Sequence, residues 1–178
     1  MTIKCSVFIA TSLDGFIARE DGSIDWLMKA NELAPEGEDG GYRDFIAGVD
    51  ALIMGRHSFN MVKTFEPWPY TVPVIVLSSQ QPEIPDALKN KVTSSSETPS
   101  ELITRLSGQG ISHLYIDGGI TIQRFLSAGC IDELIITIVP ILLGKGKRLF
   151  GDLTQDIPLH LVNSRALGGG FTQMHYQI

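Results

Sequence analysis

Apolar positions along the chain switch between short continuous runs and helical spacing. Continuous apolar or β-branched runs predict strands at residues 4–10, 51–54, 72–77, 113–116 and 133–139, with a small strand at 91–94. Helical spacing and capping residues predict helices at residues 42–49, 56–62, 98–108 and 120–128. Two further β-rich segments, 159–165 and 172–177, flank three glycines and predict an antiparallel pair that closes the fold.

This order of elements predicts an α/β fold. Strands and helices alternate up to residue 139 and strands alone follow, which is typical of a three-layer αβα sandwich. Its central sheet is expected to be mainly parallel and to end in antiparallel strands. The length of 178 residues suits one domain over residues 1–178, and no repeat or linker divides it.

Three glycine or serine turns fall at the carboxyl ends of predicted strands, where ligands bind in sheets of this kind. They are Gly55, Ser78–Ser79 and Gly118–Gly119. Gly55 leads into a helix that opens with Arg56, and free N–H groups at a helix start together with a guanidinium suit a phosphate. If the three turns share one crevice, the ligand is long and carries more than one phosphate.

The segment between the first strand and Trp26 reads as a loop, but it is unusually apolar. Leu13, Phe16 and Ile17 interrupt its turn pairs. Such a loop is expected to fold over something flat and partly apolar. A ligand ring and the protein's own core both fit this description.

Five motifs in register resemble one enzyme superfamily. The string IMGRHSF at 53–59, VIVLSS at 74–79 and YIDGG at 115–119 are similar to the cofactor segments of the dihydrofolate reductase superfamily. SLDGFIA at 12–18, and IDEL at 131–134 with PILLG at 140–144, are more like the reductase domain of bacterial riboflavin biosynthesis and its stand-alone relatives. The resemblance covers nearly the whole chain and implies a dihydrofolate reductase-like fold, with a mobile flap near residues 11–26.

The resemblance also implies NADPH as the cofactor and divides the chain's candidate residues among its parts. The 2′-phosphate and adenosine end is assigned to Gly55, Arg56, His57, Ser58, Leu77, Ser78 and Ser79. The pyrophosphate is assigned to Asp117, Gly118, Gly119, Ile120 and Thr121, and the nicotinamide to Ala10, Gly15 and Ile17. Arg56 is the residue expected to discriminate NADPH from NADH, because its guanidinium can form a bidentate contact with a 2′-phosphate and not with a bare ribose.

The implied reaction is hydride transfer to a C=N or C=O group of a pteridine- or pyrimidine-type substrate. A 5-amino-6-(5-phosphoribosylamino)uracil reductase, as in riboflavin biosynthesis, fits best. Dihydrofolate reductase activity, a non-catalytic NADPH-binding module and an unrelated anion-binding protein remain alternatives. The zinc motif of the deaminase domain that usually accompanies this reductase does not occur in the sequence.

The proton donor and the substrate contacts are less clearly marked. Asp39 lies nearest to the position expected for the donor, and Asp14 is a second candidate, with Asp25 and Glu32 not excluded. Asp25–Trp26 resembles the acidic–tryptophan stretch of the superfamily and is assigned to the substrate. Lys145, in a Gly-Lys loop, is a candidate for the substrate phosphate.

Composition narrows the setting. A net charge of −6 argues against a nucleic-acid partner, and the two cysteines lack metal-ligand spacing, as in a cytoplasmic protein without a metal site. The most apolar run, 134–143, is broken by Pro140 and is too short to span a bilayer. The slightly longer segment from Ile131 to Leu143 is apolar enough to lie partly at a subunit contact. The similar riboflavin-type domains are usually dimers, so a homodimer with a small-molecule substrate is expected.

Overall fold

The computed structural model describes residues 2–178 and contains the following elements. The strands are β1 (Lys4–Ser12), β2 (Phe16–Ala18), β3 (Ala51–Gly55), β4 (Val74–Leu77), β5 (Val92–Ser95), β6 (His113–Asp117), β7 (Glu133–Val139), β8 (Lys147–Arg148), β9 (His160–Gly168) and β10 (Phe171–Gln177). The helices are α1 (Asp25–Asn31), α2 (Tyr42–Ala47), α3 (Arg56–Val62), the short 3-10 helix η1 (Asp86–Leu88), α4 (Pro99–Ser107) and α5 (Gly119–Ser127).

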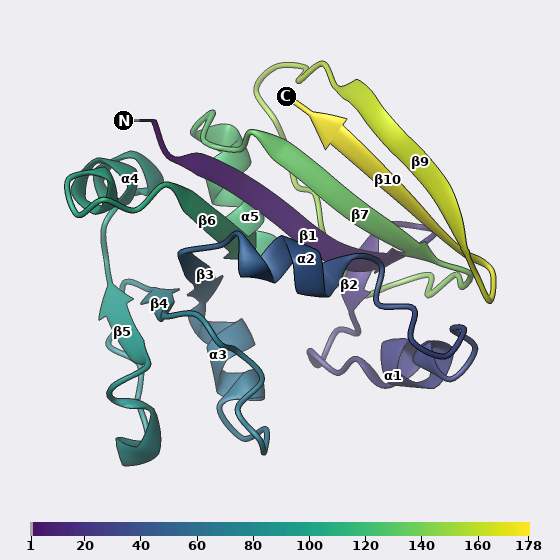
Figure 1. The fold of residues 1–178 in the computed structure, drawn as a ribbon, viewed down its shortest axis with the longest axis horizontal. Helices are drawn as coiled ribbons and strands as arrows, with labels where there is room; N and C mark the ends of the chain where they lie inside the picture. Colours follow the sequence, from purple (N-terminus) through teal and green to yellow (C-terminus); the bar gives the residue numbers. More distant parts are fainter. Residues whose placement is uncertain (1) are drawn as a thin grey trace.

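Within the described residues, eight of the strands form one sheet in the order β5–β4–β3–β6–β1–β7–β10–β9 (Figure 1). Strands β1, β3, β4, β5, β6 and β7 pair in parallel, and β10 pairs with both β7 and β9 in antiparallel fashion. The predicted α/β sandwich, mainly parallel with antiparallel strands at the C-terminus, is therefore confirmed.

Helices cover both faces of the sheet because successive side chains of a strand point to opposite sides. Ile53 packs in the cluster that contains Leu102 of α4 and Phe125 of α5. Its neighbour Met54 packs on the other side with Phe59 of α3. Figure 1 shows α2 in front of the sheet and α5 behind it. The helix α4 begins with the predicted capping box, in which Thr98 and Glu101 bond each other's backbone N–H groups.

The register of the parallel strands brings their carboxyl ends to one edge of the sheet. Met54 pairs with Asp117, Gly55 pairs with Leu77, and Leu77 pairs with Ser95. The turns that follow β3, β4, β5 and β6 therefore start side by side. The fold thus places the three sequence-predicted turns along a common edge.

Two regions differ from the sequence-based expectation. Helix α1 follows the apolar loop directly, and no side chain caps its N-terminus, so the sequence gives no signal of where the helix begins. Strands β2 and β8 form a separate two-stranded sheet, each too short to leave a periodic pattern. The expected long loop is therefore partly ordered as a flap.

Within the apolar run 134–143, strand β7 lies between β1 and β10 and is partly buried, whereas Leu142 beyond it is 68% exposed. The expected subunit contact along this run stays a prediction. Within residues 2–178, no helix combines the length and the apolar character that crossing a membrane requires.

Candidate active site

The turns after β3 and β6 pack so closely that a Cβ atom on either of their glycines would displace a neighbouring hydroxyl group. A Cβ atom on Gly118 would lie 2.7 Å from Ser58 Oγ, and one on Gly55 would lie 2.9 Å from Thr121 Oγ1. Gly118 also has a φ of +89°, which side-chain-bearing residues rarely adopt. The starts of α3 and α5 are thus held together, and with them two of the three predicted cofactor segments.

The turn after β4 supplies the third segment. The guanidinium of Arg56 donates a hydrogen bond to the side-chain oxygen of Gln80. The N–H of Gln80 donates in turn to Ser78 Oγ at 3.1 Å. Arg56 is half-buried and His57 is exposed. The cation that the sequence marked for a phosphate therefore lies beside the serine turn.

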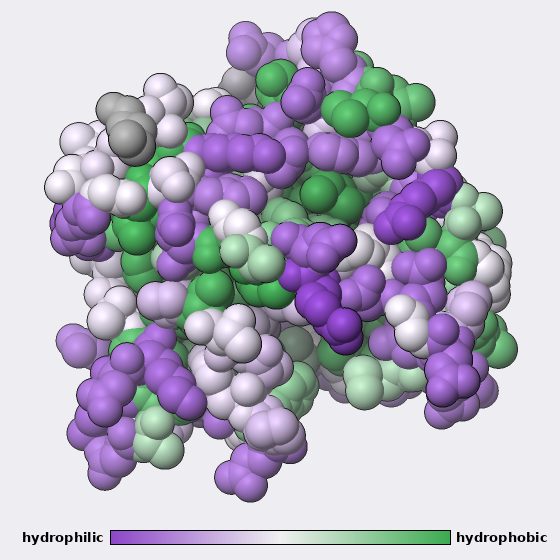
Figure 2. Space-filling model, in the orientation of Figure 1, coloured by the Kyte–Doolittle hydropathy of each residue, from purple (hydrophilic) through white to green (hydrophobic). Residues whose placement is uncertain are grey.

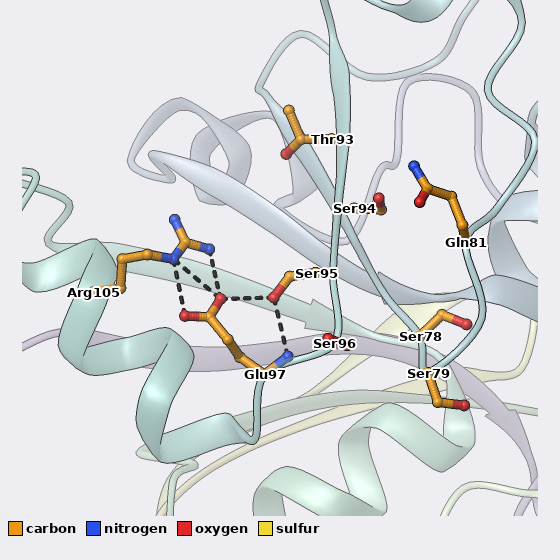
Figure 3. Close-up of a pocket in the computed structure, with 9 residues that line it drawn as sticks. All are labelled: Ser78, Ser79, Gln81, Thr93, Ser94, Ser95, Ser96, Glu97 and Arg105. Carbon is orange, nitrogen blue, oxygen red and sulfur yellow. Dashed lines mark hydrogen bonds and ion pairs between the residues drawn. The ribbon is translucent and has the colours of Figure 1, made fainter.

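A cavity of about 620 Å³ opens beyond the ends of β4 and β5 (Figure 3). Its lining is strongly polar and consists of Ser78, Ser79, Gln81, Thr93, Ser94, Ser95, Ser96, Glu97 and Arg105. Figure 3 shows Glu97 and Arg105 facing each other, with Ser95 bonded to Glu97. The sequence predicted the two serines of the first turn, but it did not predict the part contributed by β5 and α4.

The flap formed by β2 and β8 covers the Gly118–Gly119 turn. A Cβ atom on Gly119 would lie 2.8 Å from the carbonyl oxygen of Arg148 and 3.0 Å from Ile17 Cδ1. The side-chain amide of Gln123 donates to that same carbonyl at 3.1 Å. Phe16, in contrast, is buried at 4% exposure. Phe16 therefore belongs to the protein's own core, and the contact of Ile17 with a ligand stays a prediction.

Asp117 is the carboxyl group at the centre of this edge. Its Oδ1 accepts one hydrogen bond, at 2.9 Å, from the N–H of Gly118. Burial raises the pKa of Asp117 to about 6. The nearby phenols of Tyr42 and Tyr70 also have raised pKa values, through burial first and the charge of Asp117 second. The raised pKa of Asp117 is a property that its assignment to the cofactor does not anticipate.

The two sequence-predicted proton donors are engaged in backbone contacts. Asp14 accepts from Ser12 Oγ at 2.6 Å and from the N–H of Gly144 at 2.7 Å, and these bonds lower its pKa to about 2. Asp39 accepts from the N–H groups of Arg43 and Gly41, which lower its pKa. Both side chains fix loops as carboxylates, so this geometry does not favour either as a proton donor.

Two of the predicted substrate residues, Asp25 and Lys145, are held in ion pairs. Asp25 is exposed and pairs with Arg19 at 2.6 Å, and Lys145 pairs with Glu20 at 3.2 Å. Trp26 is 3% exposed, and its indole N–H has no hydrogen-bond partner in the described part of the chain. Their roles therefore stay predictions.

The edge of the sheet thus combines an arginine, paired glycine turns, a serine-lined cavity and a carboxyl of raised pKa. Residues 4–172 match the sequence profile of the RibD C-terminal domain. The chain belongs to this family. The predicted membership is confirmed, and the enzyme type associated with the family is the reductase of the riboflavin pathway.

Known relatives agree with this membership. The uncharacterized protein YwjB of Bacillus subtilis is 38% identical over 179 residues, covering 99% of this chain and 98% of YwjB. A solved structure of a putative riboflavin biosynthesis protein from Shewanella sp. PV-4 has 40% identity and a TM-score of 0.91, with 98% of each chain covered.

A more distant structure is the deaminase/5-amino-6-(5-phosphoribosylamino)uracil reductase of Thermotoga maritima. It is 16% identical with a TM-score of 0.72, and the match covers 99% of this chain and 56% of that enzyme. This likeness shows the fold alone.

Proposed function

We propose that this RibD C-terminal family member is an NADPH-dependent reductase that transfers a hydride to a C=N or C=O group of a pyrimidine- or pteridine-type substrate. A reaction of the 5-amino-6-(5-phosphoribosylamino)uracil reductase type fits best. The observation that carries the proposal is the meeting of the turns after β3, β4 and β6, with Arg56 among them.

The residues present fit a phosphorylated dinucleotide. Helix α5 begins at Gly119, directly after the turn at Gly118, and the free N–H groups of its first turn would hold a pyrophosphate. Arg56 would hold the 2′-phosphate, and the serine-lined cavity would take the adenosine end. When bound, NADPH supplies the hydride, and the chain's own residues orient the reactants.

Asp117 is proposed as the group that holds a proton for the reduced nitrogen or oxygen. Its pKa of about 6 leaves a protonated fraction near neutral pH, as a general acid requires. The aromatic rings of Tyr42 and Phe8 lie on the same side of the sheet, with their centroids 5.6 Å apart. They would provide a flat apolar surface for a heterocycle. A phosphate on the substrate would be met by the cations around β8, including Lys145 and Lys147.

Arg56→Ala tests the cofactor assignment. We expect NADPH to bind about 10- to 100-fold more weakly, because a charge-assisted contact contributes about 1.5–3 kcal/mol. NADH should change by less than about three-fold, because it lacks the 2′-phosphate that Arg56 would contact. Fluorescence titration of both nucleotides measures this, with Arg124→Ala on the exposed side of α5 as the control. An equal loss for NADPH and NADH would contradict the assignment.

A non-catalytic NADPH-binding module is the second candidate. It is favoured by the engagement of Asp14 and Asp39 in backbone contacts, which removes the two expected donors. NADPH oxidation with ribosylaminopyrimidine and dihydropterin substrates separates the two functions. Turnover supports the reductase, and tight NADPH binding without turnover on any C=N compound supports the module.

We also propose a homodimer, with the β9 edge as a candidate for its contact. This outer strand is exposed along most of its length and carries Leu161 at 58% and Val162 at 49% exposure. Figure 2 shows apolar side chains gathered near the start of this strand. A long apolar edge strand is a template for pairing with another strand, and self-pairing would satisfy its free backbone groups. Sedimentation that gives a monomer of 19.5 kDa would contradict this.

A further inference from the structure

The serine-lined cavity contains a balanced pair of charges. Arg105 Nη2 lies 2.8 Å from Glu97 Oε2, and Arg105 Nε lies 3.0 Å from each carboxylate oxygen. Glu97 is held from the other side by Ser95, whose hydroxyl donates to it at 2.6 Å. These bonds lower the pKa of Glu97, so the carboxylate remains charged. The cation of this cavity is therefore already neutralised by its own neighbour.

This charge balance favours different binding places for the phosphate and for the neutral part of a dinucleotide. A phosphate in the cavity would stand beside the Glu97 carboxylate, and the repulsion would offset its attraction to Arg105. Arg56 lies at the same 78–81 turn and is bonded to the neutral amide of Gln80. Arg56 is thus the cation suited to a phosphate, whereas the cavity suits a neutral polar group.

The shape of the pair points to a flat ligand. Among the described residues that line the cavity, none carries an aromatic ring on which a base could stack. The planar group is the guanidinium of Arg105, whose orientation is fixed by its three contacts with Glu97 (Figure 3). Guanidinium planes stack on aromatic rings, and nucleobases stack on guanidinium planes.

We propose that Arg105, oriented by Glu97, is the stacking surface for the nucleobase of the bound dinucleotide, with the hydroxyls of Ser94 and Ser96 meeting its polar edge or ribose. This inference rests on the proposed NADPH-dependent function and adds to it the residue that recognises the base. Glu97 is a positioning residue, because it acts through Arg105.

The test compares substitutions that remove the planar guanidinium of Arg105 with and without its positive charge. Arg105→Ala and Arg105→Lys should both weaken NADPH about ten-fold, because each removes the guanidinium plane and lysine restores only the charge. Adenosine 2′,5′-bisphosphate, which carries the base without the nicotinamide, should weaken by the same factor. Isothermal titration measures both ligands. Reduced nicotinamide mononucleotide, which lacks the base, should bind each variant as it binds the wild type.

Glu97 and a control variant complete the design. Glu97→Gln should weaken NADPH by about three-fold, because the guanidinium loses part of its orientation. Glu97→Asp should recover part of this loss. Arg124→Ala, a substitution of an exposed arginine outside the cavity, should change nothing. Thermal unfolding of each variant verifies that the fold is retained.

Three results would overturn the inference. Wild-type affinity in Arg105→Lys would mean that charge and not the plane matters. Tighter NADPH binding by Glu97→Gln would mean that the cavity holds a phosphate. Unchanged affinity in Arg105→Ala would remove Arg105 from the site while NADPH binding by the wild type still supports the proposed function. A wild-type protein that binds none of these nucleotides would instead contradict the proposed function itself.

Discussion

The two ends of the central sheet each carry a carboxyl group shielded from solvent, and the pKa values of the two groups are shifted in opposite directions. At the carboxyl end, Asp117 receives one N–H from Gly118, and burial raises its pKa to about 6. At the other end, Glu133 is 4% exposed. Burial opposes its ionisation, but Lys4, Ser6 and His175 donate hydrogen bonds that outweigh burial and lower its pKa.

The difference lies in the number of partners. Glu133 on β7 bonds Lys4 at 2.8 Å and Ser6 at 2.6 Å, both on β1, and His175 on β10 at 2.9 Å, so its carboxylate links three strands. Ser6 also lies 2.7 Å from His113 Nε2, which extends the network to a fourth strand. Several hydrogen-bond donors favour the charged form of a carboxyl group, whereas burial with a single donor favours the protonated form. We therefore assign structure to one end and chemistry to the other.

Asp117→Asn should give the largest effect, and it should be an effect on activity. Without a proton to transfer, kcat/KM of the proposed reduction should fall about 10²- to 10⁴-fold. The free energy of unfolding should stay the same or rise at neutral pH, because the amide removes a charge that burial disfavours. Steady-state NADPH oxidation and urea denaturation measure the two. A loss of stability with activity retained would reverse the proposed role of this carboxyl.

Glu133→Ala should give the opposite pattern. Removal of this carboxylate leaves His175 and Ser6 without their shared acceptor, and we expect a loss of about 2–3 kcal/mol of unfolding free energy. Activity per folded molecule should be unchanged, since Glu133 lies at the far end of the sheet from the turns after β3 and β6. Denaturant titration gives the first quantity, and kcat at saturating NADPH gives the second. A large fall in kcat would show that the two ends are coupled.

The sequence predicted the carboxyl end of the sheet better than the opposite end. Gly55 and Ser78 follow apolar strands directly and Gly118 follows one after a single aspartate, so local pattern is enough to find them. The Glu133 network has no local pattern, because Ser6 and Glu133 are 127 positions apart. The structural role of Asp14 also leaves no local pattern, because its partner Gly144 lies 130 positions away. The sequence therefore allows a catalytic interpretation of this residue. The α1 helix and the β2–β8 flap are too short to leave a readable period.

The two carboxyl groups should change the free energy of unfolding with pH in opposite directions. We expect this effect to be smaller than those of Asp117→Asn and Glu133→Ala. Asp117 has a folded pKa of about 6, above its ordinary value of 3.8. It therefore favours the folded state below pH 3.8, and this contribution is lost as pH rises through about 6. Glu133 has a lowered pKa, so its contribution is present above its ordinary value of 4.5 and is lost as pH falls through its folded pKa.

Urea denaturation of the wild type, Asp117→Asn and Glu133→Ala between pH 4 and pH 8 measures these contributions. The stability of Asp117→Asn relative to the wild type should rise across pH 4–7, and that of Glu133→Ala should recover only toward acid pH. The rate of the proposed reduction should fall above about pH 6, where Asp117 loses its proton. If Asp117→Asn instead parallels the wild type at every pH, Asp117 does not titrate in this window. The contrast between the two ends of the sheet would then rest on partner number alone.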